Sequence, residues 1–171
     1  ITLTSLDMED PQGDKAIIPL LEQMGASFKI DRDSITVKKS KELKGARIDC
    51  NDMIDALPIL AVIGCFAEGQ TEIVNAAIAR KKESDRIEKI TTELKKMGAN
   101  IEEKSDGLLI RRSKLKGAKV QAHHDHRIAL ALSIAAMAVE SGETTIEGAS
   151  CIKKTYPTFF SDFTSLGAFL S

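Results

Sequence analysis

DRIEKITTELKKMGANIEEKSDGLLI, residues 85–110, decides the fold, because the chain carries this stretch twice in related form. Its partner is DKAIIPLLEQMGASFKIDRDSITV, residues 14–37, at a spacing of about 72 residues. Two shorter pairs keep this spacing, LKGARI from Leu43 with LKGAKV from Leu115 and EGQTEIVNA from Glu68 with SGETTIEGA from Ser141. Self-similarity at a fixed period marks repeated structural units, so the sequence predicts two copies of one folding unit.

The apolar pattern of the second copy predicts the order of elements within the unit. Apolar residues recur at helical spacing from Ile87 to Met97, and Gly98 follows as the expected helix C-cap. A hairpin with its turn at 104–107 comes next, and AKVQA predicts a further strand. The run 128–139 is apolar almost all round, so we expect a helix covered on every side, with TTIEG as a final strand. The unit is therefore αββαβ or a close variant, which is typical of layered α/β or α+β folds.

The repeat also predicts boundaries within the chain. The two units span approximately residues 10–80 and 81–154. Residues 155–171 begin a third unit, because SLGA resembles the KMGA that ends the first helix of the second unit, but no strands follow. We expect the missing strands to come from another part of a longer parent chain.

Length and composition limit the kind of protein. With 171 residues, 43% of them hydrophobic, the chain is long enough for one substantial globular domain or two small ones. Its 24 basic and 25 acidic residues nearly cancel, which argues against nucleic acid as a partner and requires any anion site to be local. The longest apolar runs hold roughly a dozen residues, whereas a membrane span needs about 20, so we expect no membrane partner.

Cysteine usage indicates the compartment. Cys50, Cys65 and Cys151 form an odd set at wide spacing without a CxxC pair. This pattern is typical of a reducing compartment and argues against a disulfide or zinc framework, so we expect a cytoplasmic protein. The chain opens at Ile1 rather than Met, from which we expect a fragment of something longer.

The sharpest motif is RKKESDR, residues 80–86, between the end of one unit and the first helix of the next. Ser84 or Asp85 can cap that helix, whose N-terminus presents free N–H groups and a partial positive charge. With Lys82 and Arg86 added, the site suits an anion, and Glu83 is placed to exchange a proton with a bound ligand. A solvated charged cap is the alternative, and the spacing alone favours it.

A second motif, HHDHR at residues 123–127, changes this balance. The repeat places Arg127 at the position that Asp55 holds in the first unit, at the start of the buried helix. Opposite charges at equivalent positions suggest sites adapted for chemistry, because packing needs neither charge. A zinc or iron site is disfavoured, since adjacent histidines cannot easily face one ion and Arg127 would repel it. A polar N-cap at Asp125 is the preferred alternative to a metal.

The third motif is CIKKTYP, residues 151–157, which the repeat aligns with the junction at 79–82. Basic residues therefore recur at equivalent junctions. Together with Arg127 and an acid at the other helix entrance, they predict a pocket for a small ligand that carries phosphate and carboxylate. Solvent exposure in a loop is the alternative for Lys153 and Lys154.

The runs KESDR, DHRIALALSIAA and CIKKTYPTFF resemble the motifs of 5-enolpyruvylshikimate-3-phosphate synthases, in the same order and across nearly the whole chain. The resemblance implies a fold of two lobes, each with three βαβαββ-type units. Residues 1–171 would then be the C-terminal lobe, with two complete units and an incomplete third that the extreme N-terminus of the parent normally completes. The N-terminal lobe would be missing.

The resemblance also implies a reaction. These enzymes transfer the enolpyruvyl group of phosphoenolpyruvate to the 5-hydroxyl of shikimate 3-phosphate and release phosphate, a step in aromatic amino acid biosynthesis. It implies no metal and no organic cofactor. Glyphosate occupies the same pocket. The fragment alone is expected to be inactive.

Site residues follow by the same resemblance. Asp55 matches the aspartate that contacts the attacking hydroxyl, and Lys82 and Glu83 match the pair beside the reacting carbon. The residues that match the grip on phosphoenolpyruvate are Arg86, Arg127, Lys154 and the neighbouring His126. Ile78 departs from the pattern, because some members have an asparagine there that contacts the shikimate ring.

Two other functions stay open from the sequence. A UDP-N-acetylglucosamine enolpyruvyl transferase has a similar fold and the same donor, although KESDR and DHR favour the shikimate enzyme. A non-catalytic anion-binding module is the other alternative. Asp55 and Glu83 argue against it, because a binder of a dianion has little use for carboxylates in its pocket.

Overall fold

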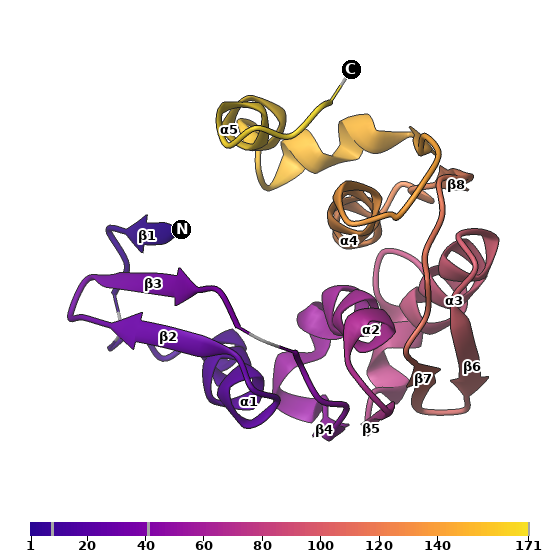
Figure 1. The fold of residues 1–171 in the computed structure, drawn as a ribbon. Helices are drawn as coiled ribbons and strands as arrows, with labels where there is room; N and C mark the ends of the chain where they lie inside the picture. The colour runs from indigo at the N-terminus through magenta and orange to yellow at the C-terminus, as the bar shows by residue number, and fades with distance from the viewer. Residues whose placement is uncertain (8, 41, 171) are drawn as a thin grey trace.

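In the described part of the chain, the strands form three β-sheets, and helices pack against the four-stranded one (Figure 1). The computed structural model describes residues 1–7, 9–40 and 42–170, so Lys41 and Ser171 of the predicted units lie outside the described residues. The strands are β1 (Thr2–Thr4), β2 (Ser27–Ile30), β3 (Ser34–Lys38), β4 (Arg47–Asp49), β5 (Gln70–Val74), β6 (Asn100–Lys104), β7 (Gly107–Arg111), β8 (Lys119–Gln121) and β9 (Thr145–Glu147). The α-helices are α1 (Ile17–Gln23), α2 (Leu57–Phe66), α3 (Arg86–Lys96), α4 (His126–Met137) and α5 (Phe159–Ser165). Short 3-10 helices are η1 (Gly13–Ala16), η2 (Asn51–Ala56), η3 (Ala77–Lys81) and η4 (Ala149–Lys154).

The same order of elements occurs twice along the chain. α1, β2, β3, β4, α2 and β5 are followed by α3, β6, β7, β8, α4 and β9, and then by η4 and α5. The variant of the unit is thus αβββαβ, with three strands between the helices. Backbone hydrogen bonds recur as well, because Gly45 donates to the carbonyl of Glu68 and Gly117 donates to that of Ser141, each at 2.7 Å.

The sheets group the strands differently from the sequence period. Strands β4-β5-β7-β6 form one sheet, in which β4 and β5 are parallel and β5, β7 and β6 are antiparallel. Residues 47–111 therefore supply a continuous βαβαββ unit. β2 and β3 pair with β1 in the order β1-β3-β2, and β8 and β9 form a separate two-stranded sheet. The strands of the predicted unit 10–80 thus divide between two sheets, and its boundaries stay a prediction from the sequence period.

The hydrophobic core lies between the four-stranded sheet and helices α2, α3 and α4. Leu57, Leu60, Ile90, Leu94 and Leu132 are completely buried in it. A β-hairpin spans the predicted turn, with Lys104 of β6 opposite Gly107 of β7. The predicted helix C-cap is also confirmed, because Gly98 follows α3 with a φ of 93°.

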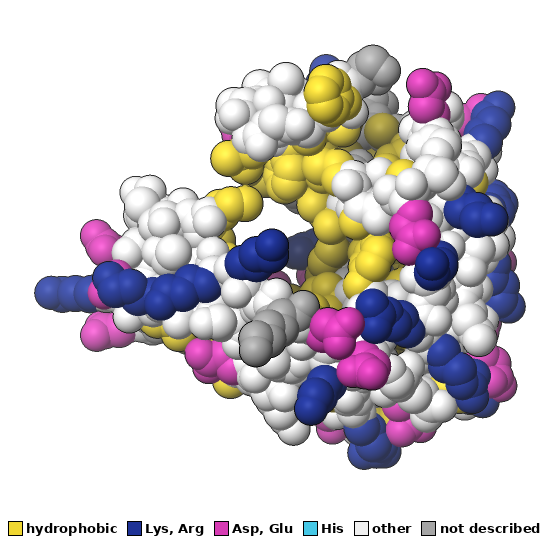
Figure 2. Space-filling model, in the orientation of Figure 1, with side chains coloured by type: hydrophobic (Ala, Val, Ile, Leu, Met, Phe, Trp, Pro, Cys, Tyr) yellow, Lys and Arg dark blue, Asp and Glu magenta, His cyan; other side chains and the backbone are white. Residues whose placement is uncertain are grey.

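One prediction about α4 is wrong. The sequence predicts a helix covered on every side, but Leu130 and Ile134 are only partly buried and Met137 is 36% exposed. These residues recur at helical spacing and so form one incompletely covered face. The space-filling view shows a hollow lined by hydrophobic side chains between the N-terminal sheet and the C-terminal helices (Figure 2). Periodicity reports how apolar a helix is, and it cannot show which neighbours are present to cover it.

None of the helices in the described residues is long and apolar enough to cross a membrane.

Candidate active site

Two helix entrances frame the candidate site. Asp85 caps α3 by accepting a hydrogen bond from the backbone N–H of Glu88 at 3.0 Å. Asp125 caps α4 in the same manner, accepting from the N–H of Arg127 at 2.9 Å. Of the two caps that the sequence offered for α3, Asp85 is the one used. The cap predicted at Asp125 is present.

Asp55, at the end of η2, is one centre of the site. Its Oδ1 accepts a hydrogen bond from Arg86 Nη1 at 2.7 Å and lies 3.3 Å from Lys82 Nζ. Its Oδ2 lies 3.8 Å from Arg127 Nη2. Three cations from three different segments therefore surround one carboxylate that is about one-third exposed.

Glu83, in the loop before α3, is the second centre. Arg86 Nη2 donates to its Oε2 at 2.8 Å. Its Oε1 lies 3.8 Å from His126 Nδ1 and 3.9 Å from Lys154 Nζ. All seven predicted site residues thus belong to one connected set, which we call the ion cluster. Its members are Asp55, Lys82, Glu83, Arg86, His126, Arg127 and Lys154.

Asp125 is a member of the site that the sequence predicts only as a cap. Its side chain is fully buried, and its Oδ2 accepts hydrogen bonds from Arg86 Nε at 2.8 Å and from the Ser84 hydroxyl at 3.0 Å. Arg86 is 1% exposed. The Arg86–Asp125 pair ties the entrance of α3 to that of α4. It links residues far apart in sequence, so the local pattern shows only that charged residues occupy both entrances.

The charges around the two aspartates control their ionisation. Burial alone would raise the pKa of Asp55, but its hydrogen bonds to Arg86 and Lys82 and their charges outweigh burial and hold the pKa below its ordinary value. Burial likewise opposes ionisation of Asp125, and the Arg86 guanidinium, the Ser84 hydroxyl and the Arg127 N–H lower its pKa. Both carboxylates are therefore ionised at neutral pH.

The cations of the ion cluster differ in their access to a ligand. Lys154 is 66% exposed, Arg127 37% and Lys82 31% at the side chain, and their contacts to carboxylates are long. Arg86 instead has its three guanidinium nitrogens bonded to Asp125, Asp55 and Glu83. The three exposed cations can take an anion directly, whereas Arg86 must first give up a carboxylate.

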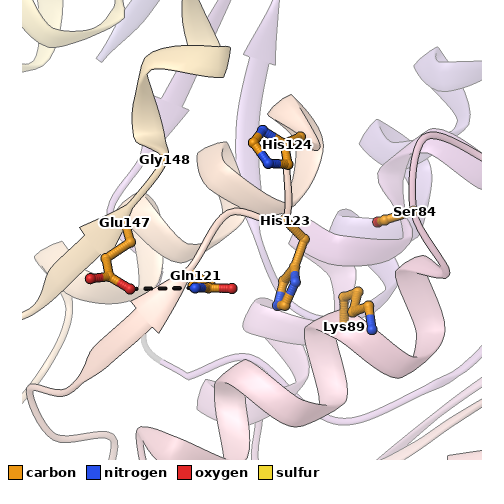
Figure 3. Close-up of a pocket in the computed structure, with 7 residues that line it drawn as sticks. All are labelled: Ser84, Lys89, Gln121, His123, His124, Glu147 and Gly148. Carbon is orange, nitrogen blue, oxygen red and sulfur yellow. Dashed lines mark hydrogen bonds between the residues drawn. The ribbon is translucent and has the colours of Figure 1, made fainter.

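A cavity of about 370 Å³ has Ser84, the chain neighbour of Glu83, in its lining (Figure 3). It is lined by Ser84, Lys89, Gln121, His123, His124, Glu147 and Gly148. None of the seven predicted residues lines it. The ion cluster therefore lies outside this cavity, with Arg86 and His126 buried and Lys154 largely exposed.

The histidines do not converge on a common point. His123 Nε2 lies 2.8 Å from the buried Glu93, whereas His126 faces Glu83. In the residues that the structure describes, no group of three or more His, Cys, Asp or Glu side chains is arranged to hold a metal ion. Ile78 is 55% exposed on η3 and has no ion-pairing group.

A family comparison identifies the chain. The model of the family described as EPSP synthase (3-phosphoshikimate 1-carboxyvinyltransferase) matches residues 1–163. The chain belongs to the EPSP synthase family. The resemblance carried by the KESDR, DHR and CIKKTYP motifs is thereby confirmed.

Curated relatives of this EPSP synthase family member cover nearly all of its length. A 3-phosphoshikimate 1-carboxyvinyltransferase of Ruminiclostridium cellulolyticum is 51% identical over 167 residues, which are 98% of this chain and 39% of the relative. One from Methanocaldococcus jannaschii is 48% identical over 169 residues, with the same coverage of 98% and 39%. The chain thus spans about 39% of the length of these relatives.

Solved structures share the fold of this EPSP synthase family member. The EPSP synthase from Acinetobacter baumannii superposes with a TM-score of 0.83 at 31% identity, covering 96% of this chain and 41% of that one. The enolpyruvyl transferase NikO from Streptomyces tendae gives a TM-score of 0.75 at 24% identity, over 98% and 38% of the two chains. The latter shows the fold alone. The predicted α/β fold of the family is confirmed.

Proposed function

We propose that the chain is the C-terminal lobe of a cytoplasmic enzyme that transfers the enolpyruvyl group of phosphoenolpyruvate to the 5-hydroxyl of shikimate 3-phosphate. The observation that carries this proposal is the ion cluster, where exposed Lys82, Arg127 and Lys154 surround the carboxylates Asp55 and Glu83. The names of the curated relatives support the activity. Because the chain spans about 39% of their length, we propose that an N-terminal lobe supplies most of the acceptor site.

Donor binding is the task of the cations. Arg127 and Lys154 receive the phosphate and carboxylate of phosphoenolpyruvate, and Arg86 adds hydrogen bonds once Asp55 or Glu83 has left it. His126 lies beside Glu83 and completes the wall of the site. Guanidinium groups suit both anions because their paired N–H groups match paired oxygens.

The carboxylates move protons. In the addition step Asp55 accepts the proton of the 5-hydroxyl, the hydroxyl oxygen bonds to the central carbon of the donor, and Glu83 gives a proton to the methylene carbon. In the elimination step Glu83 takes a proton back from the resulting methyl group, the carbon–oxygen bond to phosphate breaks, and phosphate departs with the proton from Asp55. Lys82 stabilises the charge that develops at the reacting centre. The lowered pKa of Asp55 keeps it ionised and able to accept a proton.

A comparison of acceptors tests this proposal. Phosphate release by the full-length protein is measured with phosphoenolpyruvate and either shikimate 3-phosphate or UDP-N-acetylglucosamine. We expect turnover with shikimate 3-phosphate. Turnover with the nucleotide sugar alone would assign the other enolpyruvyl transferase function, and tight donor binding without turnover would leave a non-catalytic anion-binding module.

A further inference from the structure

Arg80 stands at the start of the RKKESDR motif but is not part of the ion cluster. Its guanidinium lies against the turn of the β6–β7 hairpin. Nε donates to the carbonyl of Ser105 at 2.9 Å, and Nη2 donates to the carbonyl of Lys104 at 2.6 Å. Nη2 also lies 2.8 Å from the carboxylate of Glu103. One side chain thus joins the end of η3 to three consecutive residues of the hairpin.

The third nitrogen of Arg80 reaches the start of α3. Nη1 donates to Asp85 Oδ2 at 2.9 Å, while Oδ1 of the same carboxylate accepts from the N–H of Glu88. Arg80 therefore holds the capping residue of α3. Both partners are only about a quarter exposed, with side-chain values of 26% and 27%, so the contact is better shielded than a typical surface ion pair.

The loop between these anchor points carries the proposed catalytic pair. Among the described residues, the backbone N–H groups of Lys82, Glu83 and Ser84 donate no hydrogen bond. The backbone of the loop is thus held at its two ends, by Arg80 and Asp85. The loop's side chains are held separately by their bonds to residues of the site.

The β6–β7 turn, to which Arg80 is bonded, is itself fixed in position. The N–H of Ala76 donates to the carbonyl of Asp106 at 2.7 Å, so the segment that leads into η3 is also bonded to the turn. A Cβ at Gly107 would overlap the carbonyl oxygen of Ile73. The backbones are in direct contact, and the turn cannot shift without moving the end of β5.

We propose that Arg80 is a positioning residue that sets the place of Lys82 and Glu83 by clamping their loop to the β6–β7 turn. The inference rests on the proposed function, because it assigns the clamp to that reaction. Arg80 acts through Asp85 and the hairpin, and in the described residues its hydrogen bonds and ion pairs go to these partners and not to the ion cluster. Arg127 and Lys154 come from α4 and η4, so the clamp controls proton transfer more than it controls donor binding.

Steady-state kinetics of the full-length protein test the clamp. We expect Arg80→Gln to lower kcat at least about tenfold, because a displacement near 1 Å misplaces a proton donor. The KM for phosphoenolpyruvate should change less than about threefold, because Arg127 and Lys154, the proposed donor-binding cations, lie outside the displaced loop. Arg80→Lys keeps a positive charge for Asp85 but lacks the guanidinium, whose several N–H groups reach several acceptors. We therefore expect its kcat to lie between those of Arg80→Gln and the wild type. Arg47→Gln removes an exposed arginine that pairs with Glu72 and is the matched control, expected within about twofold of wild type.

Amide hydrogen exchange gives a second readout that does not need turnover. We expect Arg80→Gln to speed exchange at the N–H of Glu88 about tenfold relative to Arg47→Gln, because the cap at Asp85 loses its support. Asp85→Asn keeps an acceptor but loses the charge pair, and it should show a smaller increase.

The outcomes distinguish a failure of the positioning role of Arg80 from a failure of the proposed function. Unchanged kcat per folded molecule in Arg80→Gln, or a KM that rises as much as kcat falls, overturns the clamp. If the wild-type protein transfers no enolpyruvyl group to either acceptor, the proposed function fails and exchange at Glu88 alone decides the clamp. If the N–H of Glu88 then exchanges at the same rate in Arg80→Gln as in Arg47→Gln, the positioning role of Arg80 is overturned.

Discussion

Arg86 holds a positive charge in the protein interior, and three carboxylates neutralise it there. Asp125 is the most deeply buried of them, with no exposed surface, while Asp55 and Glu83 are about one-third exposed. Burial makes each ion costly unless its partner is present, so the loss of one partner costs more than the pair contributes when intact. The two exposed carboxylates are free to respond to a ligand, and the buried one fixes the guanidinium.

Asp125→Asn tests the buried pair. We expect a loss of about 3 kcal/mol in the free energy of unfolding, because Arg86 keeps its charge while losing its buried counter-ion. Urea unfolding gives the value. Glu72→Gln, which breaks the exposed pair with Arg47, should cost at most about 1 kcal/mol. Equal losses for the two variants would contradict the assignment.

The pH dependence of stability follows from the same carboxylate. Because the pKa of Asp125 is lower in the folded protein than in the unfolded chain, its stabilising effect is complete above about pH 4, near the ordinary aspartate pKa, and is lost as the pH falls toward the folded pKa. We expect the free energy of unfolding of the wild type to drop more steeply below about pH 4 than that of Asp125→Asn. Parallel curves would show that Asp125 does not titrate in this way.

Glu83→Gln separates proton transfer from binding. In the full-length protein we expect kcat to fall at least about a hundredfold, the range that positioned acid–base groups supply. The affinity for phosphoenolpyruvate should stay within about threefold, because the exposed cations remain. Single-turnover rates and donor titration measure the two quantities. An unchanged rate would remove Glu83 from the proposed mechanism.

How far a residue can be predicted depends on the range of its contacts. Charges at KESDR and DHR are visible in sequence because both stand at predicted helix entrances, and the repeat brings Asp55 and Arg127 into register. The bond between Arg86 and Asp125 depends on how α3 and α4 pack, and no local pattern contains that information. Arg80 is the opposite case, because it belongs to the motif by sequence yet bonds to the hairpin.

At the scale of elements, two equivalent glycines show why the repeats keep their sequence. Gly45 and Gly117 each lie two residues before a strand, β4 and β8 respectively. A Cβ on Gly45 would overlap the carbonyl oxygen of Gln70, and a Cβ on Gly117 would overlap that of Glu143. LKGARI and LKGAKV therefore share their glycine for a steric reason. The pattern itself shows only that the residue recurs.

Alanine substitution checks this close approach. We expect Gly117→Ala to lower the free energy of unfolding by about 2 kcal/mol or more, since the backbone must move to make room. Gly64→Ala is the control, because its nearest atoms are side-chain atoms of Ile110 and Thr71 at 3.2 Å and the helix gains propensity from alanine. It should change stability by less than about 1 kcal/mol. Similar losses at both sites would argue against a special role for the approach at Gly117.

At the scale of the whole molecule, the period of the sequence repeat does not determine which strands pair in a sheet. The sequence predicts helices, hairpin and strands in their correct order, since these depend on local periodicity and turn residues. It does not predict that β2 and β3 join β1 while β4 and β5 join β6 and β7, because strand pairing is decided by contacts between distant segments. The exposed face of α4 escapes prediction for the same reason.

The chain as a whole presents only the donor half of the proposed site. We expect the isolated chain to bind phosphoenolpyruvate weakly and to release no phosphate with shikimate 3-phosphate, because it spans about 39% of the length of its relatives and the proposed N-terminal lobe is not part of it. Isothermal titration and a phosphate assay measure both. Turnover by the isolated chain would show that the acceptor needs no second lobe.

The continuity of residues 47–111 has a consequence for synthesis of the protein. Every strand of the β4-β5-β7-β6 sheet and the two helices α2 and α3 leave the ribosome before any part of α4 does. Translation adds about 5–20 residues each second, whereas hairpins close in microseconds, so this sheet has time to assemble on the nascent chain. The apolar surface of α2 then stays uncovered for roughly one to several seconds until α4 emerges. A chaperone that binds apolar surface on nascent chains would engage this protein in that interval.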